Sequence, residues 1–271
     1  MRATADLMNR YAMPLGRMAA ALCTTAAILA LGAPRAQAAQ DTPAAALPVG
    51  LMHVAPPFQG GQKVRTPETP DETLVAALAS ALHRTATIAP LTDSPDQVQL
   101  LRVATKAHSV MPGKTRVATG YRYTPMAIMR SDTDIKSWAQ LRGRTVCLSA
   151  GSVYEGVMAR DYGAIEKALP APADSLLALR TGGCDAAVHD DVTLKALLTY
   201  PEWKKFSAHL IGDTSSELVF NIPSGDTATV DAARALTQSW EQEGYLKKLN
   251  AKRVRDMAFE VYLDQTVPDC H

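Results

Sequence analysis

RGRTVCLSAGSVYEGV, residues 142–157, joins a short apolar strand to a turn suited to holding a ligand. The run 145–149 predicts a buried β-strand, and the Gly151-Ser152 step after it predicts a helix over about 151–160. A helix that begins at Ser152 presents unpaired backbone N–H groups and its positive dipole end to an anion. Gly151 would let a ligand approach the backbone closely. An ordinary N-cap is the alternative role for Ser152, and the two roles are compatible.

The alternation of strand and helix continues on both sides of this stretch and predicts an α/β protein. Short apolar runs predict strands, and apolar residues spaced three and four apart predict helices. Strands that alternate with helices favour parallel sheets covered on both faces. The predicted strands are 47–54, 98–104, 126–130, 145–149, 186–190 and 217–222, and the predicted helices begin near 71, 151, 174, 191 and 227, the last reaching about 250.

The first forty residues predict an export signal. Arginines precede an apolar run over 18–33, and the AQA sequence at 36–38 resembles a cleavage site. The alternative, a membrane anchor, needs roughly 20 apolar residues, whereas Pro34 and Arg35 end this run early. We therefore expect a signal peptide over 1–38 and a periplasmic protein.

Charge and cysteine content restrict the partners and the covalent structure. The chain has 271 residues, and cleavage after Ala38 would remove four arginines and one aspartate, a net +3, taking the formal charge from +1 to −2. A chain with this charge lacks the excess of basic residues that binds nucleic acid, so we expect no nucleic-acid partner. Three cysteines would be left in a compartment that permits disulfides, so one bridge and one free thiol is the simplest expectation. They are Cys147, Cys184 and Cys270.

Four stretches together resemble family 3 of the periplasmic solute-binding proteins, the proteins that serve amino-acid ABC importers. The resemblance covers about 45–250 and is one of pattern. The stretches are LPVGLMHVAPPF (47–58), MAIMRSDTDIKSWAQLRGRTVCLSAGS (126–152), LLALRTGGCDAAVHDD (176–191) and ELVFNIPSGDTATVDAARALTQSWEQEGYLKKL (217–249).

The resemblance implies an α/β, two-lobed, type II periplasmic-binding-protein fold. Each lobe would have a parallel-rich sheet with helices on both faces, and a ligand would bind in the cleft while the lobes close around it. The implied divisions are lobe 1 at 45–126 plus 215–250, lobe 2 at 127–214, and a C-terminal extension at 251–271.

The resemblance also implies a set of ligand-binding residues on lobe 2. In the family, the step at Gly151, Ser152 and Val153 helps to bind the α-carboxylate of the ligand, and the aspartate at the position of Asp190 binds its α-amino group. The two side chains would lie at the carboxyl ends of strands, where open α/β sheets place ligands. Asp190 could equally cap the helix that follows it.

Lobe 1 departs from the family pattern. Met52 and Ala55 stand where the family has an aspartate and an aromatic residue. The family's carboxylate-binding arginine is matched in spacing by Lys114, which lacks the planar fork of arginine. Arg116 and Arg102 are the other candidate cations, and the choice among the three stays open, as does a solvated role for each. The aromatic residues expected to line the cleft or the core are Phe58, Tyr121 and Tyr123.

A disulfide follows from the resemblance as well. In the family's fold, the strand that contains Cys147 lies beside the strand that Cys184 precedes, within reach of a bridge. We therefore expect a Cys147–Cys184 disulfide, with a pairing of Cys270 as the rival.

Three functions are consistent with these patterns. The leading one is a monomeric carrier of a small amino-acid-like or anionic solute for an ABC permease or a sensor, without a cofactor. The second is a cyclohexadienyl-dehydratase-like enzyme, for which Glu155 is the one acid near the Gly-Ser turn. The third is an accessory protein with a degenerate pocket. No catalytic residue and no metal site is predicted, because His189 and its acidic neighbours on a strand point to opposite faces, and residues 151–153 do not form a nucleophile elbow.

Overall fold

Two five-stranded sheets form the core of the computed structural model, which describes residues 45–54, 63–107 and 111–266. The predicted signal peptide, Ala55, Phe58 and Cys270 lie outside these residues. All of the described residues belong to one compact unit. No helix among them is long and apolar enough to cross a bilayer.

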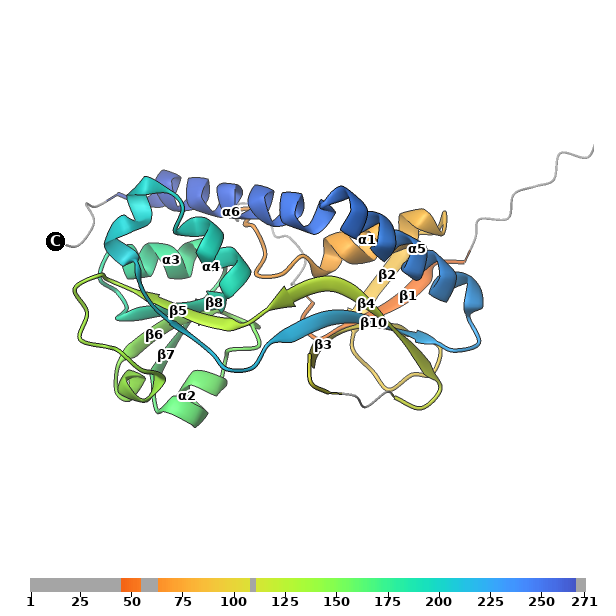
Figure 1. The fold of residues 1–271 in the computed structure, drawn as a ribbon, viewed down its shortest axis with the longest axis horizontal. Helices are drawn as coiled ribbons and strands as arrows, with labels where there is room; N and C mark the ends of the chain where they lie inside the picture. The colour runs from red at the N-terminus through yellow and green to blue at the C-terminus, as the bar shows by residue number, and fades with distance from the viewer. Residues whose placement is uncertain (1–44, 55–62, 108–110, 267–271) are drawn as a thin grey trace, which may run out of the picture. The chain divides into compact units, whose positions relative to one another are not determined.

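The first sheet, with its helices, is called lobe 1 from here on (Figure 1). Its strand order is β2-β1-β3-β10-β4, in which β1 pairs with β2 and β3 in parallel and β10 pairs with β3 and β4 antiparallel. The apolar faces of two helices bury this sheet. The elements are β1 (Leu47–Leu51), β2 (Ala86–Pro90), β3 (Val98–Ala104), β4 (Lys114–Tyr123), β10 (Ser216–Pro223), α1 (Asp71–Ala81) and α5 (Thr227–Glu243).

The second sheet, with its helices, is called lobe 2. Its strand order is β7-β6-β8-β5-β9, with β6 parallel to β7 and β8, and β5 antiparallel to β8 and β9. Alternate residues of β5 enter separate hydrophobic clusters on the two faces of the sheet. The elements are β5 (Pro125–Met129), β6 (Thr145–Ser149), β7 (Ile165–Leu169), β8 (Ala186–Asp190), β9 (Ala208–Ile211), α2 (Val157–Tyr162), α3 (Pro172–Arg180), α4 (Asp191–Leu197) and the 3₁₀ helices Trp138–Leu141 and Pro201–Phe206.

The chain crosses between the lobes twice, and the two-lobed α/β fold implied by the resemblance is confirmed. It leaves β4 for β5 at Thr124 and returns from β9 to β10 through 212–215. Thr124 is held at the crossing by Asp191, whose carboxylate accepts the Thr124 N–H at 2.7 Å. Each sheet is mixed rather than fully parallel, because the strands next to the crossings reverse direction.

The predicted Cys147–Cys184 disulfide is present, with 5.9 Å between the Cα atoms. Cys147 lies in the middle of β6, which pairs with β8. Cys184 precedes β8, so the bridge joins the end of β8 that is opposite to Asp190.

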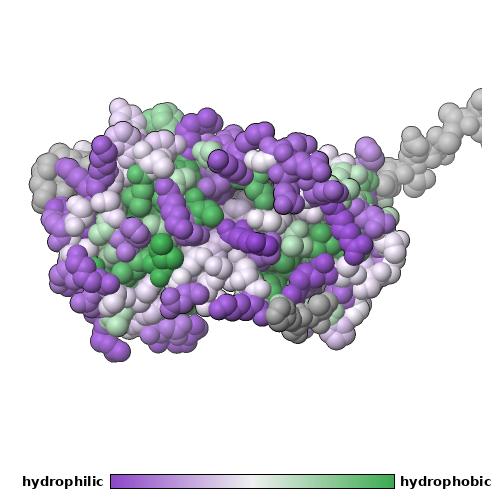
Figure 2. Space-filling model, viewed as in Figure 1, coloured by the Kyte–Doolittle hydropathy of each residue, from purple (hydrophilic) through white to green (hydrophobic). Residues whose placement is uncertain are grey.

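The final helix, α6 (Tyr245–Asp264), packs against helices of both lobes (Figure 1). The predicted single helix from 227 to about 250 is wrong, because Gly244 adopts a left-handed conformation with φ of 63° and separates α5 from α6. The helix continues through 251–264, and Val254 and Val261 enter the same hydrophobic cluster as α3 and α4. Hydrophilic side chains cover most of the face that Figure 2 shows along this helix.

Candidate binding cleft

A largely buried ion pair joins the two lobes at the cleft. Arg102 comes from β3, and its Nη1 lies 3.5 Å from the carboxylate of Asp190 at the end of β8. The hydroxyl of Tyr154 donates to the same carboxylate at 2.5 Å and that of Tyr121 at 3.3 Å. Asp190 has no exposed surface. The guanidinium also lies 4.4 Å from the centre of the Tyr123 ring, in cation–π geometry.

Burial and mutual attraction set the charge states in this cluster. Burial raises the pKa of Asp190, and the positive charge of Arg102 opposes that rise. Burial would lower the pKa of Arg102, but the attraction of Asp190 and neighbouring groups prevails and raises it. Burial also raises the pKa of Tyr121 and of Tyr154. Arg102 therefore stays cationic, and the tyrosines stay hydrogen-bond donors.

Two cavities flank Arg102, with volumes of about 420 and 760 Å³. Both are in the size range of small-molecule sites. Asp190 lines neither of them, because its carboxylate is enclosed by its partners. The residues that line both cavities are Met52, Arg102 and Val153.

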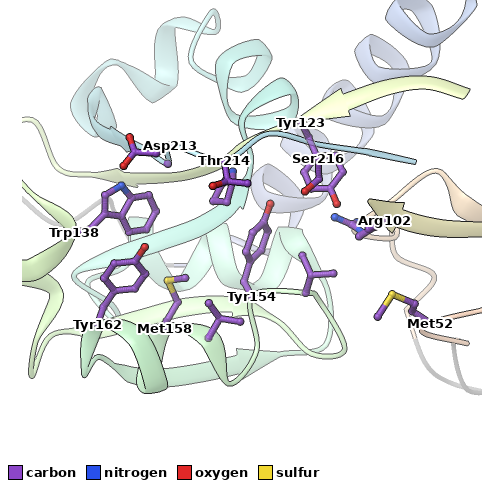
Figure 3. A pocket seen from close by; sticks show the side chains of 14 residues that line it. Met52, Arg102, Tyr123, Trp138, Tyr154, Met158, Tyr162, Asp213, Thr214 and Ser216 are labelled. Carbon is purple, nitrogen blue, oxygen red and sulfur yellow. The ribbon is translucent and has the colours of Figure 1, made fainter. Parts of the chain in front are cut away.

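The smaller cavity has an aromatic end and a polar end (Figure 3). The rings of Trp138 and Tyr162 lie 5.2 Å apart, with Met158 beside them. Arg102 lies at the other end, and the ring of Tyr154 stands between the two ends. The indole N–H of Trp138 donates to the carbonyl of Ile211 at 3.2 Å, which fixes the ring.

The larger cavity contains a second buried polar group, centred on Glu68. Its carboxylate accepts from Ser149 Oγ at 2.5 Å and lies 2.8 Å from His189 Nδ1. His189 Nε2 lies 2.5 Å from Ser175 Oγ, so both ring nitrogens are engaged. Burial would raise the pKa of Glu68, but the charge and hydrogen bond of His189, with help from Ser149, outweigh burial and lower it.

Glu68 belongs to a segment, residues 63–70, that we call the tether. It precedes α1 of lobe 1 but fastens onto lobe 2 and α6. Arg65 pairs with Asp174 of α3 at 2.7 Å. Arg253 of α6 donates to the Glu68 carbonyl at 2.6 Å. The tether therefore crosses one side of the cleft.

The helix that we predicted to begin at Ser152 does not begin there, and Gly151, Ser152 and Val153 line the larger cavity from a turn. Residues 150–156 form turns and α2 begins at Val157, because Gly151 and Gly156 adopt positive φ angles of 72° and 79°. The Gly151 N–H donates to the Glu155 carboxylate at 2.6 Å, so the chain's own acid takes the place expected for a ligand. The predicted N-cap role of Ser152 is wrong too, and its Oγ is buried without a partner among the described residues. Val153 lines both cavities.

Asp190 occupies the N-cap position of α4, but its side chain makes no capping bond. The capping alternative is therefore not what fixes this carboxylate, since its described partners are the guanidinium and the two phenols.

Among the three candidate cations, the structure brings Arg102 to the cavities. Lys114 Nζ instead donates to the carbonyls of Ser94, Pro95 and Gln97 at 2.7–3.1 Å. Arg116 donates to the Ala107 carbonyl at 3.3 Å. Neither Lys114 nor Arg116 is among the described residues that line these two cavities.

Several residues of the cleft gave no recognisable signal in the sequence. Tyr154 lies in the turn that we predicted as a helix, and Trp138 lies in the 3₁₀ helix Trp138–Leu141, for which we predicted no element. Glu68 lies between the strand predicted at 47–54 and the helix predicted to begin near 71, and its pairing with His189 depends on the folded chain. Within the described ranges, no three His, Cys, Asp or Glu side chains gather as a metal site would require.

No protein-family model and no curated protein matches the chain. Solved structures do. An ancestral cationic amino acid solute-binding protein (AncCDT-1) has a TM-score of 0.50 at 18% identity, over 77% of this chain and 95% of that one. A substrate-binding protein of an amino acid ABC transporter has a TM-score of 0.47 at 18% identity, and the match covers 77% of this chain and 98% of that one. AbpA from Streptococcus pneumoniae, bound to L-arginine, has a TM-score of 0.48 at 16% identity, and the match covers 78% of this chain and 95% of that one. The two mixed sheets, the two crossings and the similarity to AncCDT-1 show the two-lobed fold of periplasmic solute-binding proteins.

Proposed function

We propose that the chain is an exported solute-binding protein that captures a small anionic or amino-acid-like solute in the cleft between its lobes. The observation that carries this proposal is the position of Arg102, a largely buried cation from lobe 1 that lines both cavities and touches lobe 2 through Asp190. A guanidinium suits a carboxylate because its planar fork matches two oxygens. The fold supports the proposal, since it places the cavities where the two sheets face each other.

The partner in this proposal is an ABC permease or a sensor that receives the solute, and the protein acts as a monomer in the periplasm. The predicted signal peptide over 1–38 and the disulfide of lobe 2 support an exported protein.

An accessory protein with a degenerate pocket is the second candidate function, and a specific observation favours it. Two groups expected to bind a ligand, the Gly151 N–H and the Asp190 carboxylate, are already bonded to Glu155 and Arg102. For the dehydratase alternative we find no comparable support, since Glu155 is exposed and does not line either cavity among the described residues.

A thermal-shift screen of the cleaved, oxidised protein separates these functions. The panel contains amino acids, dicarboxylates, opines and apolar carboxylates. One solute class should raise the melting temperature in a saturable way, because a ligand at 100 times its Kd adds about 2.7 kcal/mol. No shift with any solute would favour the accessory protein, and turnover of a cyclohexadienyl acid would favour the enzyme.

A further inference from the structure

We infer that the smaller cavity takes an aromatic carboxylate and does not require an amino group on it. This inference deepens the proposed function and rests on it. The carboxylate would meet Arg102, and the ring would pack among Trp138, Tyr162 and Met158 (Figure 3).

The polar end of the cavity fits an anion. Arg102 is the one cation among the described residues that line this cavity. A guanidinium has five N–H donors, so the Nη1 contact with Asp190 leaves others for a second carboxylate. Its stacking on Tyr123 holds the fork in one orientation.

The other end fits a ring. Two aromatic side chains with centroids 5.2 Å apart, and a thioether next to them, form a polarizable apolar surface. Trp138 is fixed by its bond to the Ile211 carbonyl, so its ring does not need a ligand to order it. A cavity of about 420 Å³ has room for one small ring with a short acid arm.

An α-amino group has no receptor next to Arg102. Asp190 is fully buried, lines neither cavity and already accepts from Arg102 and the tyrosines. Asp213, the one acid among the described lining residues, lies beside Trp138 at the far end (Figure 3). An ammonium bonded to the carbon next to the carboxylate would therefore face a guanidinium without an acid to pair with it.

The test compares three ligands with one skeleton: 3-phenylpropionate, L-phenylalanine and 2-phenylethylamine. Binding to the cleaved, oxidised protein is followed by thermal shift and by tryptophan fluorescence, with L-arginine and L-glutamate as references. We expect saturable binding of 3-phenylpropionate, binding of phenylalanine that is weaker by about tenfold or more, and none of the amine. Equal or tighter binding of phenylalanine or of the amine would overturn the inference.

The references separate a failure of this inference from a failure of the proposed function. If arginine or glutamate binds and 3-phenylpropionate does not, the inference is wrong and the carrier function stands. If no solute in this panel or in the wider screen binds, both are wrong.

Variants locate the site. Trp138→Ala should weaken 3-phenylpropionate about tenfold, and Trp138→Phe should bind it but lose the fluorescence change. The matched control is Phe259→Ala, which removes an exposed ring of α6 outside the cavity and should leave binding unchanged. Unchanged binding in Trp138→Ala would place the ligand elsewhere and overturn the assignment.

Discussion

The Arg102–Asp190 pair is costly to bury and is held by several partners at once. Two opposite charges in a protein interior lose hydration, and their attraction compensates only when the remaining hydrogen bonds are satisfied. The two tyrosines supply those bonds to the carboxylate. Removing one charge therefore harms the protein more than removing a surface charge would.

Arg102→Gln should destabilise the protein by about 3–5 kcal/mol, because it leaves Asp190 buried without its cation. The control Arg122→Gln breaks a pair with Glu217 in which the arginine side chain is 70% exposed, and it should cost at most about 1 kcal/mol. Urea unfolding measures both values. Equal midpoints for the two variants would show that the buried pair contributes no more than a surface pair, and adding Asp190→Asn to Arg102→Gln should recover part of the loss.

Glu68 should make stability depend on pH in the acid range. The pKa of Glu68 is lower in the folded protein than in the unfolded chain. Its ionised carboxylate therefore adds to the free energy of unfolding fully above about pH 5, and this contribution is lost as the pH falls through the folded pKa. Glu68→Gln should cost about 2 kcal/mol near pH 6, and the difference from the wild type should shrink towards pH 3. Urea titrations at several pH values measure this, and a constant difference would contradict it.

The position of a site residue could be predicted only where the strand that contains it was predicted. Arg102 lies in a strand that the sequence identified, and it reaches the cavities. Lys114 lies at the first residue of β4, a strand that was not predicted. Since β4 runs antiparallel to β10, Lys114 pairs with Pro223, whereas Tyr123 pairs with Ser216 at the cleft. Spacing along the chain could not reveal which end of β4 faces the ligand.

The predicted strands are the inner strands of both sheets, and those missed are the edges. Inner strands are buried on both faces and give continuous apolar runs, which is the pattern that sequence reasoning detects. Edge strands are half exposed and carry charges, as in IEKAL at 165–169. The missed strands are β2, β4, β7 and β9, and the identified ones are β1, β3, β5, β6, β8 and β10.

The turn before α2 shows why short helices are hard to place from sequence. A Gly-Ser step after a strand is typical of a helix start, but two glycines with positive φ five residues apart keep 151–156 out of the helix. Acidic side chains bind the freed N–H groups, since Glu166 accepts from Gly156 and Ala159 at 2.8 Å.

The C-terminal half of α6 should contribute to stability through its buried face. Val261 is 1% exposed in the cluster shared with α3, while its neighbour Tyr262 is 75% exposed. Val261→Ala should cost about 1–2 kcal/mol through lost burial and the cavity left behind. Tyr262→Ala, with the same gain in helix propensity, should stay within about 0.5 kcal/mol. Urea unfolding compares them, and similar costs would mean that α6 is not anchored on lobe 2.

Contacts across the two lobes should make the protein unfold as one unit. The helix α6 packs on α3, α4 and α5, and the tether binds lobe 2 at Glu68 and Arg65. The two-lobed fold was predictable because family-like motifs lie next to both crossings. The contacts that α6 and the tether make with both lobes were not predictable, because they join residues far apart in the chain.

Hydrogen exchange tests whether the two lobes unfold together. Peptides that cover β3 in lobe 1 and β8 in lobe 2 should open with free energies that agree within about 0.5 kcal/mol, because both report global unfolding. Val261→Ala should lower both values together. A large gap between β3 and β8, or a decrease confined to β8, would show that the lobes unfold independently.

The tether has a kinetic consequence for any molecule trapped in the cleft. Separation of the lobes with the tether held on lobe 1 would break the Glu68–His189 and Arg65–Asp174 contacts together. If the chain binds a solute as we propose, the rate at which the solute leaves would depend on how often the tether contacts break, in addition to the solute's own contacts with the cleft.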